Sequence, residues 1–410
     1  MPWLNAWQAG RWVLIRTISL YTGAGGLDLG LEQAGFSHVG CVEVDGDARK
    51  TLQANRPDWP LARSGDIHDY TADALLDHFG IRGATVDLLA GGPPCQPFSK
   101  SRFWRTEDRA SLSDPRARTL RAFLKVAYAS LPRAVLIENV EGITYRNNRE
   151  AVRFIERSFD TINAKSGTSY RVHYFNIDAS HYGVPQSRRR TFLVASRDGR
   201  TFSLPKPTHG AGGEPFLTAW DAIGALGDPP TDEPLAPTGK WAGLLPSIPE
   251  GENYLWHTSR GGGMPLFGWR TRYWSFLLKL KKDKPSWTIV AQPGGSTGPF
   301  HWSNRRLSTR ELCRLQTFPD SYRVHGSYRS AVRQIGNAVP PALGELIGKQ
   351  IRVQFFDETV NDSLVFVPRR RGDTPPPDQV QPVPSRFYRY LGDHPDHPGA
   401  GYGPGVRGRG

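Results

Sequence analysis

Cys95 is the residue of this chain whose surroundings most clearly favour chemistry. It follows an apolar run at residues 86–90, which we interpret as a buried strand, and the turn Gly-Gly-Pro-Pro at residues 91–94. Because proline fixes φ and glycine permits close approach, this turn holds the cysteine at the carboxyl end of a strand, where ligands collect in open α/β sheets. The thiol is therefore a candidate nucleophile, whereas a lone cysteine is otherwise commonly an inert core residue.

Two carboxylates also stand where apolar runs end. Glu43 lies in the run at residues 39–44, about twenty residues after the glycine turn Gly-Ala-Gly-Gly at residues 23–26. That spacing is typical of nucleoside sites, in which the acid holds the ribose hydroxyls. A tight turn with a capping acid is the structural alternative. Glu138 follows the apolar run at residues 134–137 and occupies the same kind of strand end.

Other polar groups have simpler alternatives. Asp66 precedes an expected helix at residues 72–79, so it could be only a helix N-cap. The arginines at residues 188–190 precede an expected strand and are typical of a solvated or phosphate-binding surface. A basic, polar stretch at residues 100–113 directly follows the Cys95 segment. A long loop beside a candidate nucleophile is the usual form of a lid, and a solvated loop is the alternative.

Strands and helices alternate over the first half of the chain, which predicts an α/β fold with a doubly wound, mostly parallel sheet. The expected strands span residues 17–21, 39–44, 86–90, 134–140, 170–177 and 191–195. The expected helices include residues 27–34, 72–79, 116–131, 149–159 and 341–355, and Ser308 with Glu311 forms a possible capping box.

Composition limits the function further. The 410 residues carry 52 Lys and Arg against 39 Asp and Glu, a net charge of +13, which favours a polyanionic partner such as nucleic acid. The cysteines Cys41, Cys95 and Cys313 have no CxxC spacing, so we expect neither disulfides nor a zinc site. This use of cysteine fits a protein of the reducing cytoplasm. No apolar run reaches the roughly 20 residues that a membrane span needs.

Composition also changes along the chain. From residue 196 to about residue 304, Pro, Gly and Trp become frequent and helical periodicity fades, which indicates a second, smaller and irregular domain. Beyond residue 368 the chain is rich in Pro, Gly and Arg, and we expect a disordered tail at residues 368–410.

Taken together, the chain resembles the DNA cytosine-5 methyltransferase family over residues 17–355, except for most of residues 196–304. The resemblance rests on eight ordered elements: YTGAGG, the strand ending at Glu43, GDI, GPPCQPFS, ENV, YGVPQSRRR, RLSTRELCRLQTFPD and RQIGNAVPP. It implies the S-adenosylmethionine-dependent methyltransferase fold, with a catalytic and cofactor-binding domain at 17–195. Residues 196–304 then correspond to a target-recognition domain, and helices at 305–357 return to the catalytic domain.

The resemblance also implies roles in catalysis. Cys95 matches the nucleophile that adds to C6 of a cytosine flipped out of the duplex, and Glu138 the carboxyl that engages N3. Arg188 and Arg190 match the arginines that support the flipped base and the catalytic loop. The remaining residues that correspond to DNA contacts of the family are Gln96, Ser99 and Thr288.

For the cofactor, S-adenosylmethionine, the resemblance implies contacts from the first two strands and their turns and from one late residue, and it implies no metal. These contacts are Tyr21, Gly23, Gly25, Gly26, Glu43, Asp66, Ile67 and Asn337. Tyr21 departs from the phenylalanine usual in the family.

Three other functions compete with methylation of DNA. RNA cytosine-5 methylation uses the same fold, but the RNA-directed relatives usually carry a Cys-Phe-Thr element in the variable region, which here lacks cysteine. A DNA-binding protein without activity would lack Cys95 or Glu138. A nicotinamide oxidoreductase would explain the glycine turn and Glu43 but not the Pro-Cys turn with Glu138 and the arginines.

The expected partners follow from the preferred function. They are double-stranded DNA and a cognate restriction endonuclease acting on the same site, with no membrane and a monomeric state. We expect a cytoplasmic, nucleoid-associated location in a prokaryote. The DNA sequence recognised cannot be read from residues 196–304, because side chains at base edges determine it.

Overall fold

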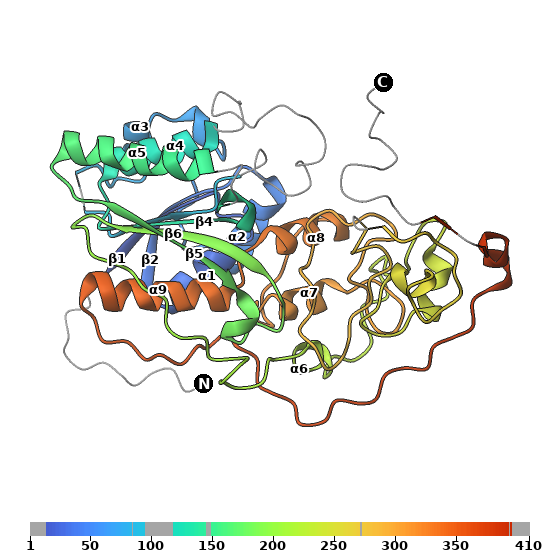
Figure 1. Ribbon diagram of the computed structural model, residues 1–410. Coiled ribbons are helices and arrows are strands. Elements are labelled where there is room, and N and C mark those ends of the chain that lie inside the picture. The colour runs from blue at the N-terminus through green and yellow to red at the C-terminus, as the bar shows by residue number, and fades with distance from the viewer. Residues whose placement is uncertain are drawn as a thin grey trace, which may run out of the picture.

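A mixed sheet lies at the centre of the larger lobe (Figure 1). The computed structural model describes residues 14–83, 85–94, 118–144, 149–270, 273–392 and 394–395. Within this part of the chain, six strands pair in the order β2-β1-β3-β4-β6-β5. β1 to β4 are parallel, and β6 is antiparallel to both β4 and β5, which confirms the expected mostly parallel sheet. The strands are β1 (Ile15–Leu20), β2 (Phe36–Val42), β3 (Leu88–Gly91), β4 (Ala134–Val140), β5 (Arg171–Asp178) and β6 (Arg189–Ser196).

Both faces of the sheet are buried under helices. Leu88 and Ala90 of β3 belong to the hydrophobic cluster on one face, whereas Leu89 belongs to the cluster on the other. This explains why the parallel strands read as continuous apolar runs. In Figure 1, α3 (Ala72–His78), α4 (Arg118–Ser130) and α5 (Arg149–Ser166) lie above the sheet, and α1 (Gly26–Gln33) and α9 (Pro341–Phe356) lie below it. The first lobe is thus doubly wound, as expected, with α2 (Gly46–Asn55) following β2.

The helices below the sheet come from opposite ends of the chain and approach closely through glycine. A Cβ atom on Gly30 of α1 would overlap the backbone N of Glu345 and the carbonyl O of Pro341 in α9. A Cβ atom on Gly344 would lie 2.5 Å from the carbonyl O of Leu27. The two backbones can therefore pack directly on each other only because both positions lack side chains.

The second lobe has little regular structure. Between residues 197 and 304, the described residues form α6 (Ala219–Ile223) and the 3₁₀ helices η7 (Ala242–Ser247) and η8 (Tyr254–His257), with isolated β-bridges in place of a sheet. A hydrophobic cluster that includes Leu244, Leu245 and Phe300 forms its core. This irregular architecture agrees with the fading periodicity of the sequence.

Two short helices connect the lobes. They are α7 (Thr309–Leu315) and α8 (Tyr328–Asn337), which share one hydrophobic cluster with Leu29 of α1 and Ile289 of the second lobe. The predicted capping box opens α7, because the Ser308 N–H donates to Glu311 Oε2 (2.7 Å) and the Glu311 N–H donates to Ser308 Oγ (3.3 Å).

The segment expected to be a disordered tail is instead placed along the molecule as far as residue 392. It leaves α9 and runs along the lower edge in Figure 1 to the far end of the second lobe, where it forms η9 (Ser385–Tyr390). Val383 and Phe387 are buried in the core cluster of that lobe. The composition argument failed because a few well-spaced apolar residues can pack on a core that another part of the chain supplies. The expectation for residues 396–410 lies outside the described residues.

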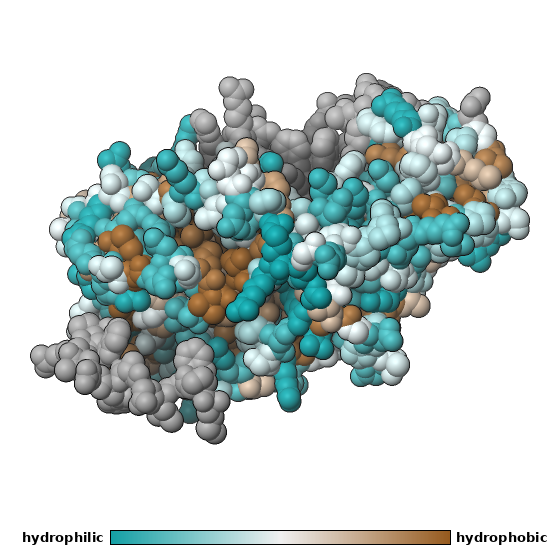
Figure 2. All heavy atoms as spheres, turned by 90° about the horizontal axis from the view of Figure 1, so that it is seen from below, coloured by the Kyte–Doolittle hydropathy of each residue, from teal (hydrophilic) through white to brown (hydrophobic). Residues whose placement is uncertain are grey.

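The surface of the lower face is mixed. Figure 2 shows a hydrophobic area enclosed by hydrophilic residues on the larger lobe, seen from below. Leu364, Phe366 and Val367, which follow α9, pack against the hydrophobic cluster beneath the sheet. Among the described residues, the helices are too short or too polar to cross a bilayer.

The α1–α9 contact makes Gly30 a sensitive position. We expect Gly30→Ala to lower the free energy of unfolding by about 1–3 kcal/mol, because the added methyl group must push two packed backbones apart. Gly46→Ala is the matched control, since nothing lies within 4 Å of its Cβ position at the start of α2. Urea unfolding of both variants measures the difference, and equal stability of the two would contradict close backbone packing at Gly30.

Candidate active site

A cavity of about 850 Å³ opens at the carboxyl ends of β1 to β4. Such a location follows from the topology, because parallel strands deliver the residues after them to one edge of the sheet. The cavity brings together most of the residues singled out in the sequence. Those that line it are Tyr21, Gly23, Gly26, Glu43, Asp66, Ile67, Glu138, Arg190 and Asn337.

The glycine turn and Glu43 form one hydrogen-bonded unit. The Gly23 N–H donates to Glu43 Oε2 (2.6 Å), and the Asp45 N–H donates to Glu43 Oε1 (2.7 Å). Burial raises the pKa of the Glu43 carboxyl, while these two N–H bonds act in the opposite direction. Gly23 has φ +59°, and no atom lies closer than 4.0 Å to its Cβ position. The turn therefore leaves open space beside a fixed carboxylate.

Gly25 has a different role from Gly23. It also has a left-handed backbone (φ +73°), but its Cβ position lies 2.9 Å from Leu52 Cδ2 and 3.2 Å from Tyr322 Oη. It does not line the cavity, so its small size serves packing behind the turn.

Tyr21 connects β1 to α4. Its backbone has φ +60°, which is uncommon outside glycine, and its hydroxyl donates to the carbonyl O of Thr119 (2.7 Å). Burial, together with the nearby Asp66 carboxylate, raises the pKa of the Tyr21 phenol well above its usual range. Strained backbone of this kind is held in place by its surroundings and concentrates at functional sites.

Asp66 is both a cap and part of the cavity wall. Its Oδ1 accepts from the His68 N–H (2.9 Å), so Asp66 caps the 3₁₀ helix η1 (Ile67–Asp69). The expected helix, α3, is capped by Thr71 instead. Ile67 is buried next to it, and Asn337, the last residue of α8, is exposed and also lines the cavity.

Glu138 and Arg190 form a buried ion pair at the cavity. Arg190 Nε lies 3.0 Å from Glu138 Oε1, and β6 brings the two together because it runs antiparallel to β4. Burial raises the pKa of the Glu138 carboxyl, and this effect outweighs the opposing charges of Arg190 and Arg188. The carboxyl therefore accepts a proton at higher pH than an ordinary glutamate does.

The turn that leads to Cys95 lies against this pair. A Cβ atom on Gly92 would lie 3.1 Å from Glu138 Oε2, and Asn139 Nδ2 donates to the carbonyl O of Pro93 (3.2 Å). Pro93 and Pro94 line the cavity. Cys95, Gln96, Ser99 and the expected lid at residues 100–113 lie outside the described residues.

The other two cysteines are unsuited to nucleophilic chemistry. Cys41 and Cys313 are buried, at 0% and 5% exposure. Burial raises the pKa of the Cys41 thiol well above its ordinary value and that of Cys313 to about 12. Since the thiolate is the nucleophile, neither side chain is reactive near neutral pH.

Arg188 is fully buried and does not line the cavity. Its guanidinium donates to backbone carbonyls on both sides of the lobe junction: those of Ile289 (3.2 Å), Gly336 (2.6 Å) and Ala338 (2.9 Å). Thr288, the predicted DNA contact, is likewise outside the cavity lining, and its hydroxyl donates to the carbonyl O of Ser187 (2.7 Å). Both side chains fix the junction between residues 185–188 and the second lobe.

The sequence analysis did not single out two further polar residues, Gln186 and Asn139. Gln186 is fully buried: its Oε1 accepts from the Ile289 N–H (3.0 Å) and its Nε2 donates to Gln316 Oε1 (3.0 Å). Asn139 is the residue that orders the turn at Pro93. Both lie within motifs that the sequence presents, YGVPQSRRR and ENV, and a polar residue inside an otherwise buried motif was the available signal.

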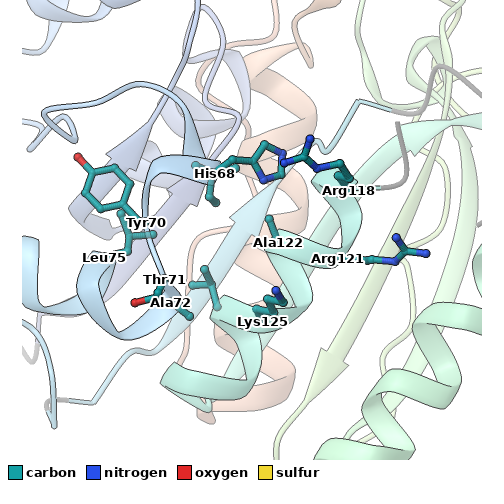
Figure 3. A pocket seen from close by; sticks show the side chains of 11 residues that line it. His68, Tyr70, Thr71, Ala72, Leu75, Arg118, Arg121, Ala122 and Lys125 are labelled. Carbon is teal, nitrogen blue, oxygen red and sulfur yellow. The ribbon is translucent and has the colours of Figure 1, made fainter. Parts of the chain in front are cut away.

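A second cavity of about 440 Å³ lies between η1, α3 and α4 (Figure 3). It shares Ile67 and His68 with the larger cavity. Figure 3 shows Arg118, Arg121 and Lys125 on α4 along one side of it. This basic lining suits an anionic group, and the sequence analysis did not anticipate it.

Known proteins resemble the chain over most of its length. The family model described as C-5 cytosine-specific DNA methylase matches residues 15–353. The type II methyltransferase M.SacI of Streptomyces achromogenes is 39% identical over 370 residues, which cover 82% of this chain and 92% of that protein. M.NgoFVII of Neisseria gonorrhoeae, another type II methyltransferase, is 31% identical over 353 residues, covering 83% and 87%.

Solved structures agree at the level of the fold. The Dnmt2 methyltransferase of S. pombe superimposes with a TM-score of 0.55 at 19% identity, over 84% of this chain and 99% of that one. The family match spans the sheet, the cavity and the junction described above. The chain therefore belongs to the C-5 cytosine-specific DNA methylases and is a DNA cytosine-5 methyltransferase.

Proposed function

We propose that the chain methylates C5 of a flipped-out cytosine within a specific duplex DNA sequence, as the modification enzyme of a type II restriction–modification system. The type II relatives support the biological setting. One observation carries the chemistry: the Glu138–Arg190 pair, the glycine turn with Glu43 and the Pro93–Pro94 turn all border one cavity. In this proposal the enzyme works as a monomer beside a cognate endonuclease.

The cavity fits S-adenosylmethionine in size and in donor set. Glu43, Asp66, Ile67 and Asn337 all line it. By resemblance, Glu43 would bind the ribose hydroxyls, Asp66 and Ile67 the adenine, and Asn337 the methionine part. When bound, S-adenosylmethionine supplies the methyl group that the cytosine takes up at C5. The residues of the chain bind it, exclude water and hold the base against it.

Cys95 is assigned the covalent step. Its thiolate forms a bond to C6, and the electrons displaced from the C5–C6 double bond make C5 a nucleophile. After C5 has gained its methyl group, loss of the C5 proton restores the double bond as the C6–S bond breaks and the thiolate leaves. The burial of Cys41 and Cys313 supports this assignment, because Cys95 is the remaining cysteine of the chain.

Glu138 is assigned to N3 of the cytosine. Negative charge develops on the ring as sulfur adds to C6, and a protonated carboxyl at N3 neutralises it. The raised pKa of Glu138 supports this role, and Arg190 holds the carboxyl in place from one side. Arg188 acts at a distance, since it fixes the strand entrance from which Arg190 projects.

The second lobe is assigned to target recognition. Residues 196–304 contain none of the catalytic motifs, and Thr288 at their border with the first lobe lies beside the residues that precede β6. By resemblance, Thr288 contacts the backbone at the target base, and Gln96 and Ser99 contact DNA from the segment after Cys95.

We expect a covalent complex when C5 of the target base carries fluorine, because the final proton removal is then blocked. The target is first mapped by methylation-sensitive sequencing of DNA from cells that express the chain. A duplex with 5-fluorocytosine at the mapped base should then form a denaturant-stable adduct only with S-adenosylmethionine present. Cys95→Ser should bind DNA but form no adduct, and an adduct that depends on Cys41 or Cys313 instead would refute the assignment.

Glu138→Gln should lower the single-turnover methylation rate by about 100-fold or more, the usual contribution of a positioned acid. If the protonated carboxyl is the active form, the wild-type rate attributable to Glu138 should fall as pH rises through its raised pKa. That alkaline decrease should be missing from the pH profile of Glu138→Gln. DNA and cofactor affinity should be unchanged in the variant, and a wild-type rate would exclude the role.

Glu43→Ala should weaken S-adenosylmethionine binding about 10- to 100-fold, the equivalent of losing hydrogen bonds to a charged group. Isothermal titration calorimetry measures the affinity directly. Glu32→Ala is the control, because Glu32 pairs with Arg56 on the surface of α1 and does not line the cavity. Equal affinities in the two variants would remove Glu43 from the cofactor site.

A further inference from the structure

The C-terminal segment at residues 376–390 is fastened to the second lobe by a charge cluster in which Lys282 and Glu250 are buried and Asp378 is 51% exposed. Lys282 Nζ lies 2.6 Å from Glu250 Oε1 and 2.6 Å from Asp378 Oδ1, and it also donates to the carbonyl O of Pro376 (3.1 Å). The side chains of Lys282 and Glu250 are only 5% and 2% exposed. The Lys282–Glu250 pair stays neutral when Asp378 is removed, whereas a cation at position 378 would face the buried ammonium of Lys282 without a carboxylate of its own.

The cluster binds the backbone of the tail as well as its side chain. The Asp378 N–H donates to Glu250 Oε1 (2.9 Å), and the Gln381 N–H donates to the carbonyl O of Pro246 (3.0 Å). Further along, Val383 and Phe387 complete the hydrophobic cluster of the lobe. The C-terminal partners in these contacts lie outside residues 15–353, the span that the family model covers.

Lys282 is also the start of the segment that meets the catalytic lobe. Its carbonyl O accepts from the Trp220 N–H (3.0 Å), and the following residues bond to residues 185–187 at the entrance to β6. The Ser286 N–H donates to the carbonyl O of Pro185 (2.9 Å), and the Thr288 hydroxyl donates to Ser187 (2.7 Å). One end of residues 282–288 is thus fixed by the tail cluster and the other by the active-site lobe.

We infer that Asp378 and Lys282 are positioning residues for target recognition: the C-terminal segment clamps residues 282–288 so that Thr288 is held for the target DNA. This inference rests on the proposed function of the second lobe. It gives the segment at residues 376–390, which follows the last helix of the catalytic lobe, a role in recognition of the target DNA.

The test compares two charge reversals in the full-length chain, one within residues 376–390 and one just before them. Asp378→Lys places a second ammonium beside Lys282, whereas Asp373→Lys makes the same change at an exposed residue that has no ion pair among the described residues. Hydrogen exchange of residues 282–289, measured without DNA, should accelerate in Asp378→Lys and stay at the wild-type rate in Asp373→Lys. Asp378→Glu keeps the charge and should restore slow exchange.

Methylation kinetics then separate positioning from general stability. In Asp378→Lys we expect the KM for target DNA to rise by about 10- to 100-fold, the cost of a small misplacement away from the reacting atoms. The discrimination against near-target sequences should fall, while S-adenosylmethionine affinity is unchanged. Loss of stability alone would lower the active fraction, and so the maximal rate, without changing KM.

Each result is decisive for the clamp. Equal exchange and equal KM in Asp378→Lys and Asp373→Lys overturn the inference, as does a change in maximal rate alone. If the wild-type chain methylates no DNA, the proposed function fails, and the hydrogen-exchange comparison still decides whether Asp378 orders residues 282–289.

Discussion

The guanidinium of Arg188 is enclosed by protein and bonds to carbonyls from two distant stretches, one around Ile289 and the other around Gly336. Removing such a cation from water costs several kcal/mol, and charge-assisted hydrogen bonds to fixed carbonyls offset that cost only in one geometry. The entrance of β6, the border of the second lobe and the end of α8 are thereby fixed to one another. Arg190 lies two residues further along the chain, so this arrangement also fixes its position beside Glu138. The same contacts fix the wall of the cavity to which Arg190 belongs.

Much of the site could be predicted because parallel strands have a simple geometry. Glu43 and Glu138 each end an apolar run, and parallel strands carry such residues to one edge, where the structure places both in the cavity. The glycine turn, the capping box at Ser308 and the alternation of strands with helices are local patterns. They could therefore be predicted without knowing which distant residues make contact. Gly25 illustrates the limit: its spacing resembles that of Gly23, yet it packs on Leu52 behind the turn.

What the sequence did not reveal depends on contacts between distant residues. Nothing near Gln186 in the chain indicates that its amide reaches Gln316, and nothing near Phe387 indicates that it completes a core built around residue 244. The basic lining of the smaller cavity arises because α4 packs beside η1, so that Arg118 and Lys125 line the same cavity as His68. Periodicity in the sequence indicates whether a segment is a helix or a strand and which of its faces is buried. It does not indicate which other element packs against that face.

The glycine contact between α1 and α9 has a consequence for how the chain is made. One face of the sheet is covered by α9, which leaves the ribosome only after the entire second lobe has been synthesised. At ordinary rates of translation, about 15 to 60 s separate the appearance of Gly30 from that of Gly344. During that interval Leu27, Leu31 and their neighbours on the sheet lack their cover. Until α9 is synthesised, the nascent chain exposes apolar surface on one face of its sheet, and such surface is prone to aggregation.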